Sequence, residues 1–218
     1  MRARSNQPGR QRSQSAETRV AILSAAEREF ARAGLAGART DVIAARAGVN
    51  KALLYYYFKS KEKLYLAVLE DHLKEFNNQA LSLLEGPGPA GDILLGYVRL
   101  QFDFISQRQR HAPLFQQLMC AGGKSSENLI RKYILPRSRA LDKLLERGIR
   151  EGVFRPVDRF HTAVSIVALI VFYFSAAPVL QSLGRSDAYR EPNLERRKDE
   201  VLAFVRHAIF RHPESSKS

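Results

Sequence analysis

The chain has 218 residues, of which 35 are Lys or Arg and 22 are Asp or Glu, so its net charge is +13. This length suits one sizeable core with a small domain attached to it. The single cysteine, Cys120, excludes an intrachain disulfide framework and a zinc cluster built on cysteines. A lone cysteine is also typical of proteins in a reducing cytoplasm.

The positive charge is concentrated at the N-terminal end. Residues 1–64 hold 13 Lys and Arg against 5 Asp and Glu, a net charge of +8, which leaves +5 for the other residues. A basic excess of this kind attracts phosphate, so it favours a nucleic acid over an acidic small substrate. Charge alone leaves open the alternative of a basic surface that only aids solubility.

Residues 1–14 read MRARSNQPGRQRSQ and contain four arginines without an apolar core. This composition is not that of a secretory signal, so we expect a disordered basic tail. Such an arm either follows the DNA minor groove or is an ordinary solvated tail. A helix is then predicted over residues 15–33, because Ile22, Leu23, Ala26 and Phe30 recur on one side.

Residues 40–64 predict two short helices around a tight turn. Thr40 is a good helix N-cap, and Ile43, Ala44 and Ala47 follow at helical spacing. Gly48 ends this first helix, because glycine takes the left-handed conformation that a sharp helix end requires. This pattern is the geometry of a helix-turn-helix that reads DNA.

The second helix of the pair is capped by Asn50 and has two different sides. Leu54, Tyr57 and Phe58 fall together at i, i+3 and i+4, which predicts a packing face. The opposite side carries the residues that are free to touch DNA, namely Lys51, Ala52, Tyr55 and Tyr56.

This segment resembles the N-terminal domain of the TetR family of transcriptional regulators. The matching positions are Thr40, Ile43, Ala44, Ala47, Gly48, Val49, Leu54, Tyr55, Tyr57, Phe58, Lys61, Glu62 and Leu64. Upstream, the positions that resemble the family's first helix and its glycine are Thr18, Ile22, Leu23, Ala25, Ala26, Phe30 and Gly34. The resemblance implies an all-α fold with a C-terminal domain that binds a ligand and forms a dimer.

The resemblance also implies that Thr40 and Lys61 hold phosphates at two helix N-termini. Leu53 departs from the family pattern, since it replaces a Thr that often reaches a base edge. Leu53 therefore either contacts a thymine methyl group or packs between helices. The predicted DNA-binding residues are Thr40, Lys51, Ala52, Leu53, Tyr55, Tyr56 and Lys61.

Nine or ten helices are expected in total, in a helix-turn-helix domain over residues 15–64 and a helical domain over residues 65–218. The loop at residues 86–91, Gly-Pro-Gly-Pro-Ala-Gly, is the clearest break. We expect a kink at Pro136, because proline lacks the N–H that a helix interior needs. The later helices are predicted at 60–85, 92–107, from about 113 to 121, 125–151, 158–180 and 193–212.

Residues 162–180 form a run of 19 residues without a charge, close to the length that spans a bilayer. A helix that is apolar all round is also what a buried or interface helix looks like. The family resemblance favours a dimer interface over a membrane anchor. The residues predicted for this interface are Val164, Val167, Ala168, Val171, Leu202, Val205 and Ile209.

Aromatic and soft side chains between residues 102 and 120, with two later tyrosines, suggest an effector pocket, although they are also what a plain core would contain. The residues predicted to line this pocket are Phe102, Phe104, Phe115, Leu118, Met119, Cys120, Tyr133 and Tyr173. We expect a small, largely apolar ligand that lowers DNA affinity when it binds there.

No catalytic constellation is visible, because the five histidines are scattered and no Gly-x-Ser-x-Gly elbow or phosphate loop occurs. We therefore predict no enzyme activity, no metal and no cofactor. The function predicted is a cytoplasmic, homodimeric regulator of transcription, most simply a repressor that a ligand releases from a near-palindromic operator on double-stranded DNA. Two alternatives remain open, namely an architectural or nonspecific DNA-binding protein and a membrane-associated protein.

Overall fold

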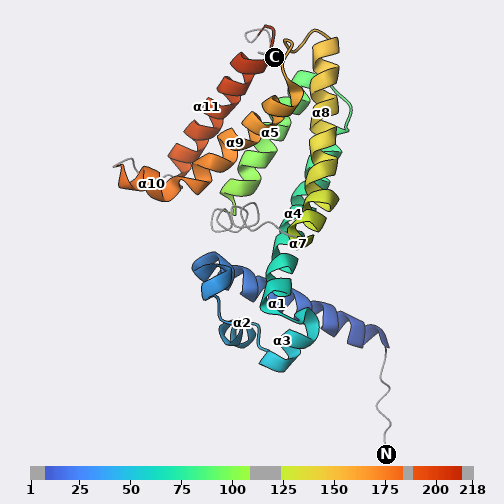
Figure 1. The fold of residues 1–218 in the computed structure, drawn as a ribbon, viewed down its shortest axis with the longest axis vertical. Helices are drawn as coiled ribbons and strands as arrows, with labels where there is room; N and C mark the ends of the chain where they lie inside the picture. The colour runs from blue at the N-terminus through green and yellow to red at the C-terminus, as the bar shows by residue number, and fades with distance from the viewer. Residues whose placement is uncertain (1–7, 109–123, 184–188, 213–218) are drawn as a thin grey trace, which may run out of the picture. The chain divides into compact units, whose positions relative to one another are not determined.

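The computed structural model describes residues 8–108, 124–183 and 189–212, and these residues are mainly helical (Figure 1). Among them no strand is formed, and only an isolated bridge joins Phe154 and Phe210. The prediction of an all-α fold is therefore confirmed. The chain divides into two units, Met1–Asp71 and His72–Ser218, and the division falls inside helix α4, Lys61–Leu84.

The N-terminal unit contains α1, Pro8–Gly37, α2, Thr40–Arg46, α3, Lys51–Phe58, and the first turns of α4. Helix α1 begins at Pro8, inside the segment that was predicted to be a disordered tail. Proline suits the first turn of a helix, since the N–H that it lacks has no partner there. Residues 1–7 of the predicted tail lie outside the described residues.

The core of the N-terminal unit is built from the periodic apolar positions of its helices. On α1 the predicted side is buried, since Ile22, Leu23, Ala26 and Phe30 are all at most 7% exposed. The other helices contribute Ile43, Ala44, Leu54, Phe58 and Leu64. Burying such side chains contributes roughly 1.5–3 kcal/mol each, which holds four short helical segments together.

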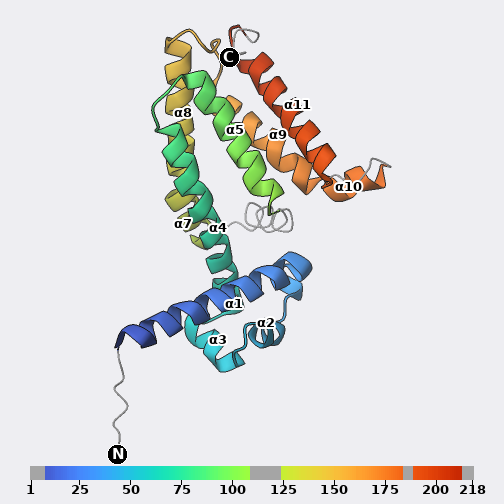
Figure 2. The same ribbon diagram turned by 180° about the vertical axis from the view of Figure 1, so that it is seen from behind.

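The C-terminal unit contains the rest of α4 and a bundle of further helices. Their bounds are α5, Ala90–Ser106, α7, Lys124–Leu129, α8, Leu135–Arg150, α9, Arg159–Ser175, α10, Ala177–Ser182, and α11, Glu191–Ile209. Helix α5 contacts α8, α9 and α11, and α9 also contacts α8 and α11 (Figures 1 and 2). The predicted helix from about residue 113 lies outside the described residues.

Two predicted helices are modified by proline. The expected kink at Pro136 takes the form of a π-helical turn, Ile130–Ile134, and α8 then begins with Pro136 in its first turn. The apolar helix predicted over 158–180 ends at Ser175, and α10 restarts after Ala176 with a proline in its first turn. Both changes follow from the missing proline N–H. In the described part of the chain, no helix has the length and apolarity needed to cross a membrane.

One end of the bundle closes through two phenylalanines that pack against glycines. The ring of Phe154 lies where a Cβ on Gly148 of α8 would be, and a Cβ on Gly91 would lie 2.7 Å from Phe210. The two rings meet with their centres 5.1 Å apart. Backbone hydrogen bonds from Arg155 N to Ile209 O, at 2.9 Å, and from Arg211 N to Val153 O, at 3.0 Å, join the same segments.

Candidate nucleic-acid interface

Gly48 and Asn50 set the turn between α2 and α3. Gly48 adopts a φ of 67°, in the left-handed region that glycine enters at little cost. The N–H of Val49 then donates to the carbonyl of Ala44 at 3.0 Å. The Oδ1 of Asn50 accepts from the Leu53 N–H at 2.8 Å, so Asn50 caps α3 as the sequence predicts.

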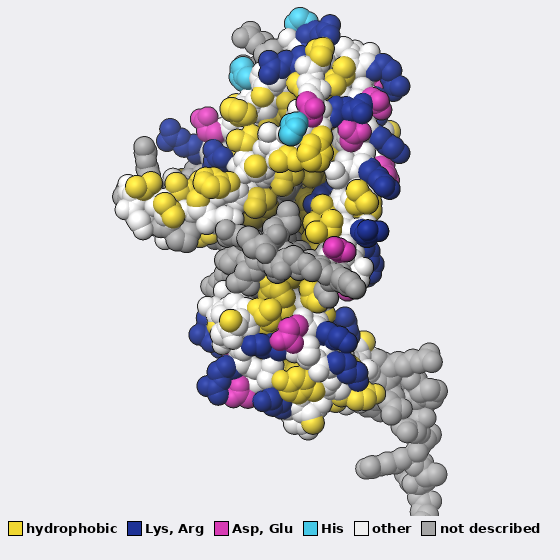
Figure 3. All heavy atoms as spheres, viewed as in Figure 1, with side chains coloured by type: hydrophobic (Ala, Val, Ile, Leu, Met, Phe, Trp, Pro, Cys, Tyr) yellow, Lys and Arg dark blue, Asp and Glu magenta, His cyan; other side chains and the backbone are white. Residues whose placement is uncertain are grey.

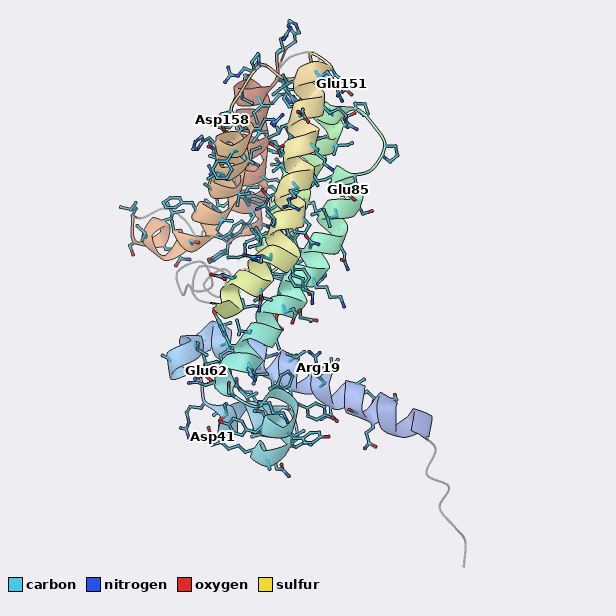
Figure 4. The ribbon with its side chains drawn as sticks, turned by 45° about the vertical axis from the view of Figure 1, so that its right-hand side comes forward. Arg19, Asp41, Glu62, Glu85, Glu151 and Asp158 are labelled. Atoms are coloured by element: carbon cyan, nitrogen blue, oxygen red, sulfur yellow. The ribbon has the colours of Figure 1, made fainter. Side chains whose placement is uncertain are left out.

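Helix α3 turns its apolar side into the N-terminal unit. Leu54 is fully buried and Phe58 is 6% exposed. The Cζ of Arg19, on α1, lies 5.6 Å from the centre of the Phe58 ring (Figure 4). Tyr57 is only half-buried, and its hydroxyl lies 3.0 Å from the Oγ of Ser15. These contacts hold α3 against α1, which fixes the side of α3 that faces outward.

The outward side of α3 carries the residues that the sequence assigned to DNA. Lys51 and Ala52 are exposed, and Tyr56 is 69% exposed, an unusual state for a large aromatic residue. Leu53 and Tyr55 are half-buried at the edge of this surface. The helix therefore exposes both a cation and an amphipathic ring, which suits contact with phosphates and base edges.

Thr40 and Tyr55 are joined to each other. The Oγ1 of Thr40 and the phenol oxygen of Tyr55 lie 3.2 Å apart, and Thr40 is only 8% exposed. This pair ties the first turn of α2 to the middle of α3. The sequence assigned both residues to DNA but did not indicate that they meet, because their separation of 15 residues carries no periodic signal.

Lys61 begins α4 and is tied to the chain that leaves α1. Its Nζ donates to the carbonyl oxygens of Ala36, at 3.1 Å, and Ala38, at 3.3 Å. An ammonium group has three donors, so these two bonds leave one for a phosphate. These two hydrogen bonds restrict the Lys61 side chain to one position.

The sequence analysis did not assign Arg39 and Lys59, which lie in the same region. Both line a shallow hollow together with Thr40, Tyr55 and Lys61. Lys59 follows α3 with a φ of 63°, and its Nζ lies 5.2 Å from the centre of the Tyr56 ring. A positive φ is strained for a side chain of this size, and such strain often marks a functional position. Only the backbone reveals it, since the sequence shows an ordinary lysine.

Glu29 connects α1 to α2 from inside the unit. Its carboxylate is fully buried and lies 2.7 Å from Arg32 and 3.1 Å from Arg46. The hydrogen bond from Arg32 lowers the pKa of Glu29, although burial opposes the shift. The ion pair with Arg46 holds α2, the first helix of the helix-turn-helix, in position.

The residues predicted for an effector pocket separate into two groups. Phe104 meets Phe76, with ring centres 4.9 Å apart, whereas Phe102 meets Phe174 at 5.2 Å. Tyr133 is buried and Tyr173 is half-buried beside Phe174. Four residues of the prediction lie outside the described residues, namely Phe115, Leu118, Met119 and Cys120.

The residues predicted for a dimer interface also divide. On α9, Val164 and Ala168 are exposed, whereas Val167 and Val171 are half-buried. On α11 the predicted residues are Leu202, Val205 and Ile209, and all three are buried in the core of their own unit. These three side chains pack within their own unit, where α11 contacts α5 and α9, and the dimer interface itself stays a prediction. Phe204, which is 58% exposed, is the large apolar side chain that α11 offers instead.

The capped α3, its exposed side and the basic residues around it define a helix-turn-helix protein of the DNA-binding class. Comparison with known proteins identifies the family. Residues 22–68 match the model for bacterial regulatory proteins of the tetR family, and residues 96–205 match a tetracyclin repressor-like C-terminal domain.

Two relatives and one solved structure show how far the similarity extends. The HTH-type transcriptional regulator RutR of Escherichia coli K12 is 31% identical over 163 residues, 75% of this chain and 76% of RutR. The HTH-type transcriptional repressor NicS of Pseudomonas putida is 30% identical over 173 residues, 78% of this chain and 81% of NicS. A regulator from Saccharomonospora viridis, solved with choline, shares the fold at 22% identity, with a TM-score of 0.74 over 90% of this chain and 100% of its own.

The chain therefore belongs to the TetR family. It is a transcriptional regulator with a DNA-binding helix-turn-helix, and not an enzyme.

Proposed function

We propose that this regulator is a homodimeric repressor that binds a near-palindromic operator and leaves it when a small ligand binds the C-terminal unit. The observation that carries the proposal is the exposed side of α3, where Tyr56 is 69% exposed while Leu54 behind it is fully buried. In a protein that binds no partner there, such a ring would more commonly be covered. The site of action is the cytoplasm, where bacterial DNA lies.

In this proposal α3 enters the major groove. Lys51 and Tyr56 contact base edges, Leu53 and Ala52 lie against thymine methyl groups, and Lys61 holds a phosphate. Thr40 and Tyr55 connect α2 to α3 at the edge of this surface through their own hydrogen bond. Lys59 adds positive charge beside the phosphate path, whereas Arg39 is paired with Asp41 at 2.6 Å, and Figure 3 shows Lys and Arg side chains around this unit.

The dimer would form through the apolar surface of α9 and α11. Phe160, Val164 and Phe172 recur along α9 at helical spacing and are 67%, 51% and 71% exposed. Phe204 of α11 is close to the same surface, since it lines a hollow together with Ser165 and Leu169 of α9. Figure 3 shows hydrophobic side chains gathered over α9 and α10. A two-fold pairing of this surface would cover it on both copies.

In a dimer with a two-fold axis, the two α3 helices can enter successive major grooves of the DNA, which are about 34 Å apart. A ligand that prefers a different spacing lowers DNA affinity by shifting the population of dimers. One relative and one protein of the same fold support this reading: NicS is named a repressor, and the Saccharomonospora viridis regulator was solved with choline.

The alternatives are less well supported. An architectural DNA-binding protein needs a basic surface but no capped recognition helix with exposed polar rings. A membrane-associated protein would need residues 162–180 as one span, whereas α9 ends at Ser175 and α10 begins at Ala177.

Selection from randomised duplex DNA tests the specific reading against the architectural one. The purified protein is incubated with the pool at near-physiological salt, the retained DNA is sequenced, and the complex is sized. We expect an inverted repeat bound by an even number of subunits. Retention without enrichment of any sequence would contradict the proposal, because phosphate attraction alone has no sequence preference.

The dimer surface has its own test. We expect Phe204→Asp to convert the dimer to a monomer in light scattering, because a charge would then lie in an apolar interface. The matched control is Val20→Asp on α1, where the side chain is 63% exposed outside the proposed interface. A Phe204→Asp protein that stays dimeric would exclude this surface.

A further inference from the structure

The interior of the C-terminal unit holds amide groups that lack hydrogen-bond partners. Asn77 on α4 and Gln101 on α5 are only 6% and 3% exposed. The Oδ1 of Asn77 and the Oε1 of Gln101 are buried without a partner. Buried polar atoms are nearly always hydrogen-bonded, because leaving them unpaired costs free energy. Two unpaired amide oxygens in one unit therefore suggest a binding site in which a ligand supplies the missing hydrogen-bond donors.

A third unpaired atom belongs to a cation close to the same rings. The Nη1 of Arg137 on α8 is buried and has no hydrogen-bond partner. The Cζ of Arg137 lies 4.8 Å from the centre of the Phe76 ring, and its guanidinium opposes the raised pKa that burial gives Tyr97. Arg137 is half-buried and its guanidinium also contacts Tyr97, so the observation is one buried N–H group, at Nη1, that lacks an acceptor.

Phe76 brings the cluster together. Its ring centre lies 6.4 Å from that of Tyr97 and 4.9 Å from that of Phe104, both on α5. Gln101 lies four residues after Tyr97 and three before Phe104, so it shares their face of α5. Asn77 is next to Phe76 in the sequence and belongs to the same buried side of α4. The effector-site cluster is Phe76, Asn77, Tyr97, Gln101, Phe104 and Arg137.

The helical segment that leads into α8 is irregular shortly before Arg137. Residues Ile130–Ile134 form a π-helical turn, and Tyr133 within this turn is buried. Such turns are rare in proteins and occur frequently at functional sites. The irregular turn ends three residues before Arg137, so one of the three unpaired atoms lies directly after it on α8, whereas the other two lie on α4 and α5.

We propose that the cluster recognises the head group of an acidic effector, a small molecule with a carboxylate, a neighbouring hydroxyl or N–H group, and an apolar body. The carboxylate pairs with the fork of N–H donors on Arg137. The hydroxyl or N–H donates to the oxygens of Gln101 and Asn77. The rings of Phe76 and Phe104 contact the body. This inference rests on the proposed function in one respect, namely that ligand binding controls DNA release, and it replaces the largely apolar ligand predicted from the sequence by an acid.

The first test needs no ligand. An amide kept for an effector contributes little to the free protein, so we expect Gln101→Met to leave the midpoint of thermal unfolding unchanged or to raise it by a few degrees. The control is Gln79→Met on the exposed side of α4, which should leave the midpoint unchanged. A midpoint that falls by several degrees only in Gln101→Met would show that Gln101 is a structural hydrogen-bonding residue, and would overturn the proposal.

The second test uses acids paired with their methyl esters. The probes are mandelate, 2-hydroxyphenylacetate and 3-hydroxydecanoate, each with a hydroxyl group close to its carboxylate, and the readouts are the thermal midpoint and calorimetric binding. We expect at least one acid to raise the midpoint, its ester to bind at least about tenfold more weakly, and Arg137→Met to lose the difference between acid and ester. The Arg139→Met variant on the same helix, where the side chain is exposed, should behave as the wild type.

Two results would contradict the proposal of an acidic effector. Esters that bind as well as acids, or a panel in which no acid changes the midpoint, would contradict an acidic effector. Neither result depends on DNA, so a failure here would leave the operator selection unaffected. Conversely, acid binding in a protein that enriches no DNA sequence would refute the proposed repressor and keep the acid site.

Discussion

The two units of this regulator differ in a few of their buried polar atoms, although both contain ion pairs, such as that of Lys198 with Asp103 in the C-terminal unit. In the N-terminal unit the polar side chains that matter are paired, as Glu29 is with two arginines, Asn50 with the Leu53 N–H, and Thr40 with Tyr55. In the C-terminal unit, Asn77, Gln101 and Arg137 each keep a buried atom without a partner. This difference is what our proposals require, namely a first unit that is preorganised for a constant partner, DNA, and a second unit whose unpaired atoms are satisfied when a ligand binds.

The largest expected effect comes from removing the buried carboxylate of the N-terminal unit. We expect Glu29→Ala to cost roughly 3 kcal/mol of folding free energy, because it removes charge-assisted hydrogen bonds to two arginines and leaves a cavity at a fully buried position. The exposed Glu17→Ala on α1 should cost less than about 0.5 kcal/mol. Chemical denaturation of both variants measures the difference, and equal losses would mean that the Glu29 pairs contribute nothing.

Glu29 also predicts how the stability of the unit depends on pH. Its pKa in the folded protein is lowered from the ordinary value of 4.5, so the stabilisation is present above pH 4.5 and is lost as the pH falls through the lower, folded value. We expect Glu29→Gln to remove this part of the acid sensitivity. If the wild type and Glu29→Gln lose stability in parallel below pH 4.5, the assigned shift is incorrect.

The next largest effect is expected in the C-terminal unit, from a substitution that does not touch the N-terminal unit. We expect Gly148→Ala to destabilise it by about 1–3 kcal/mol, since the new methyl group would overlap the ring of Phe154. Gly96→Ala in α5 is the control, because its Cβ would lie 3.5 Å from Leu83 and alanine favours a helix by about 0.5–1 kcal/mol. Calorimetry should show the loss for Gly148→Ala alone.

A smaller effect is expected on the DNA side. Tyr56→Ala should leave stability unchanged and lower affinity for the operator by about 1–3 kcal/mol, because an exposed ring contributes to base contacts and not to the core. Binding to a scrambled duplex should change much less. Equal losses on both duplexes would assign Tyr56 to phosphate contact and remove it from sequence recognition.

The smallest effect concerns Lys61. We expect Lys61→Ala to weaken binding to every sequence and to reduce the slope of log affinity against log salt by about one. Lys74→Ala, an exposed lysine of α4 outside the N-terminal unit, should leave the slope unchanged. An unaltered slope in Lys61→Ala would mean that its bonds to Ala36 and Ala38 are its whole role.

Sequence reasoning predicted the parts of the structure that are encoded locally. Gly48 and Asn50 act on residues no more than four positions away, so the turn and the cap are readable from the sequence. The apolar residues of α1 also recur at helical spacing, and the structure buries the side of the helix that this spacing predicts. The pairing of Glu29 with Arg46, which lie 17 residues apart, has no local signal and was missed.

The C-terminal unit was less readable for a related reason. Periodicity identifies the apolar side of α11, but it does not say whether Val205 and Ile209 are covered by the same chain or by a partner. Likewise, a Gln in an otherwise apolar stretch of α5 looks like a surface residue until the fold shows it buried. Unpaired polar atoms such as Gln101 Oε1 are a property of the assembled bundle.

The central claim is that the exposed side of α3 reads sequence and does not merely attract phosphate. The most direct test is the ratio of dissociation constants for a scrambled duplex and for the selected inverted repeat, measured at one near-physiological salt concentration. We expect a ratio of about 10³ or more for the wild type, and a much smaller ratio for Tyr56→Ala. A wild-type ratio close to one would contradict the account and leave only a basic protein that holds DNA by its charge.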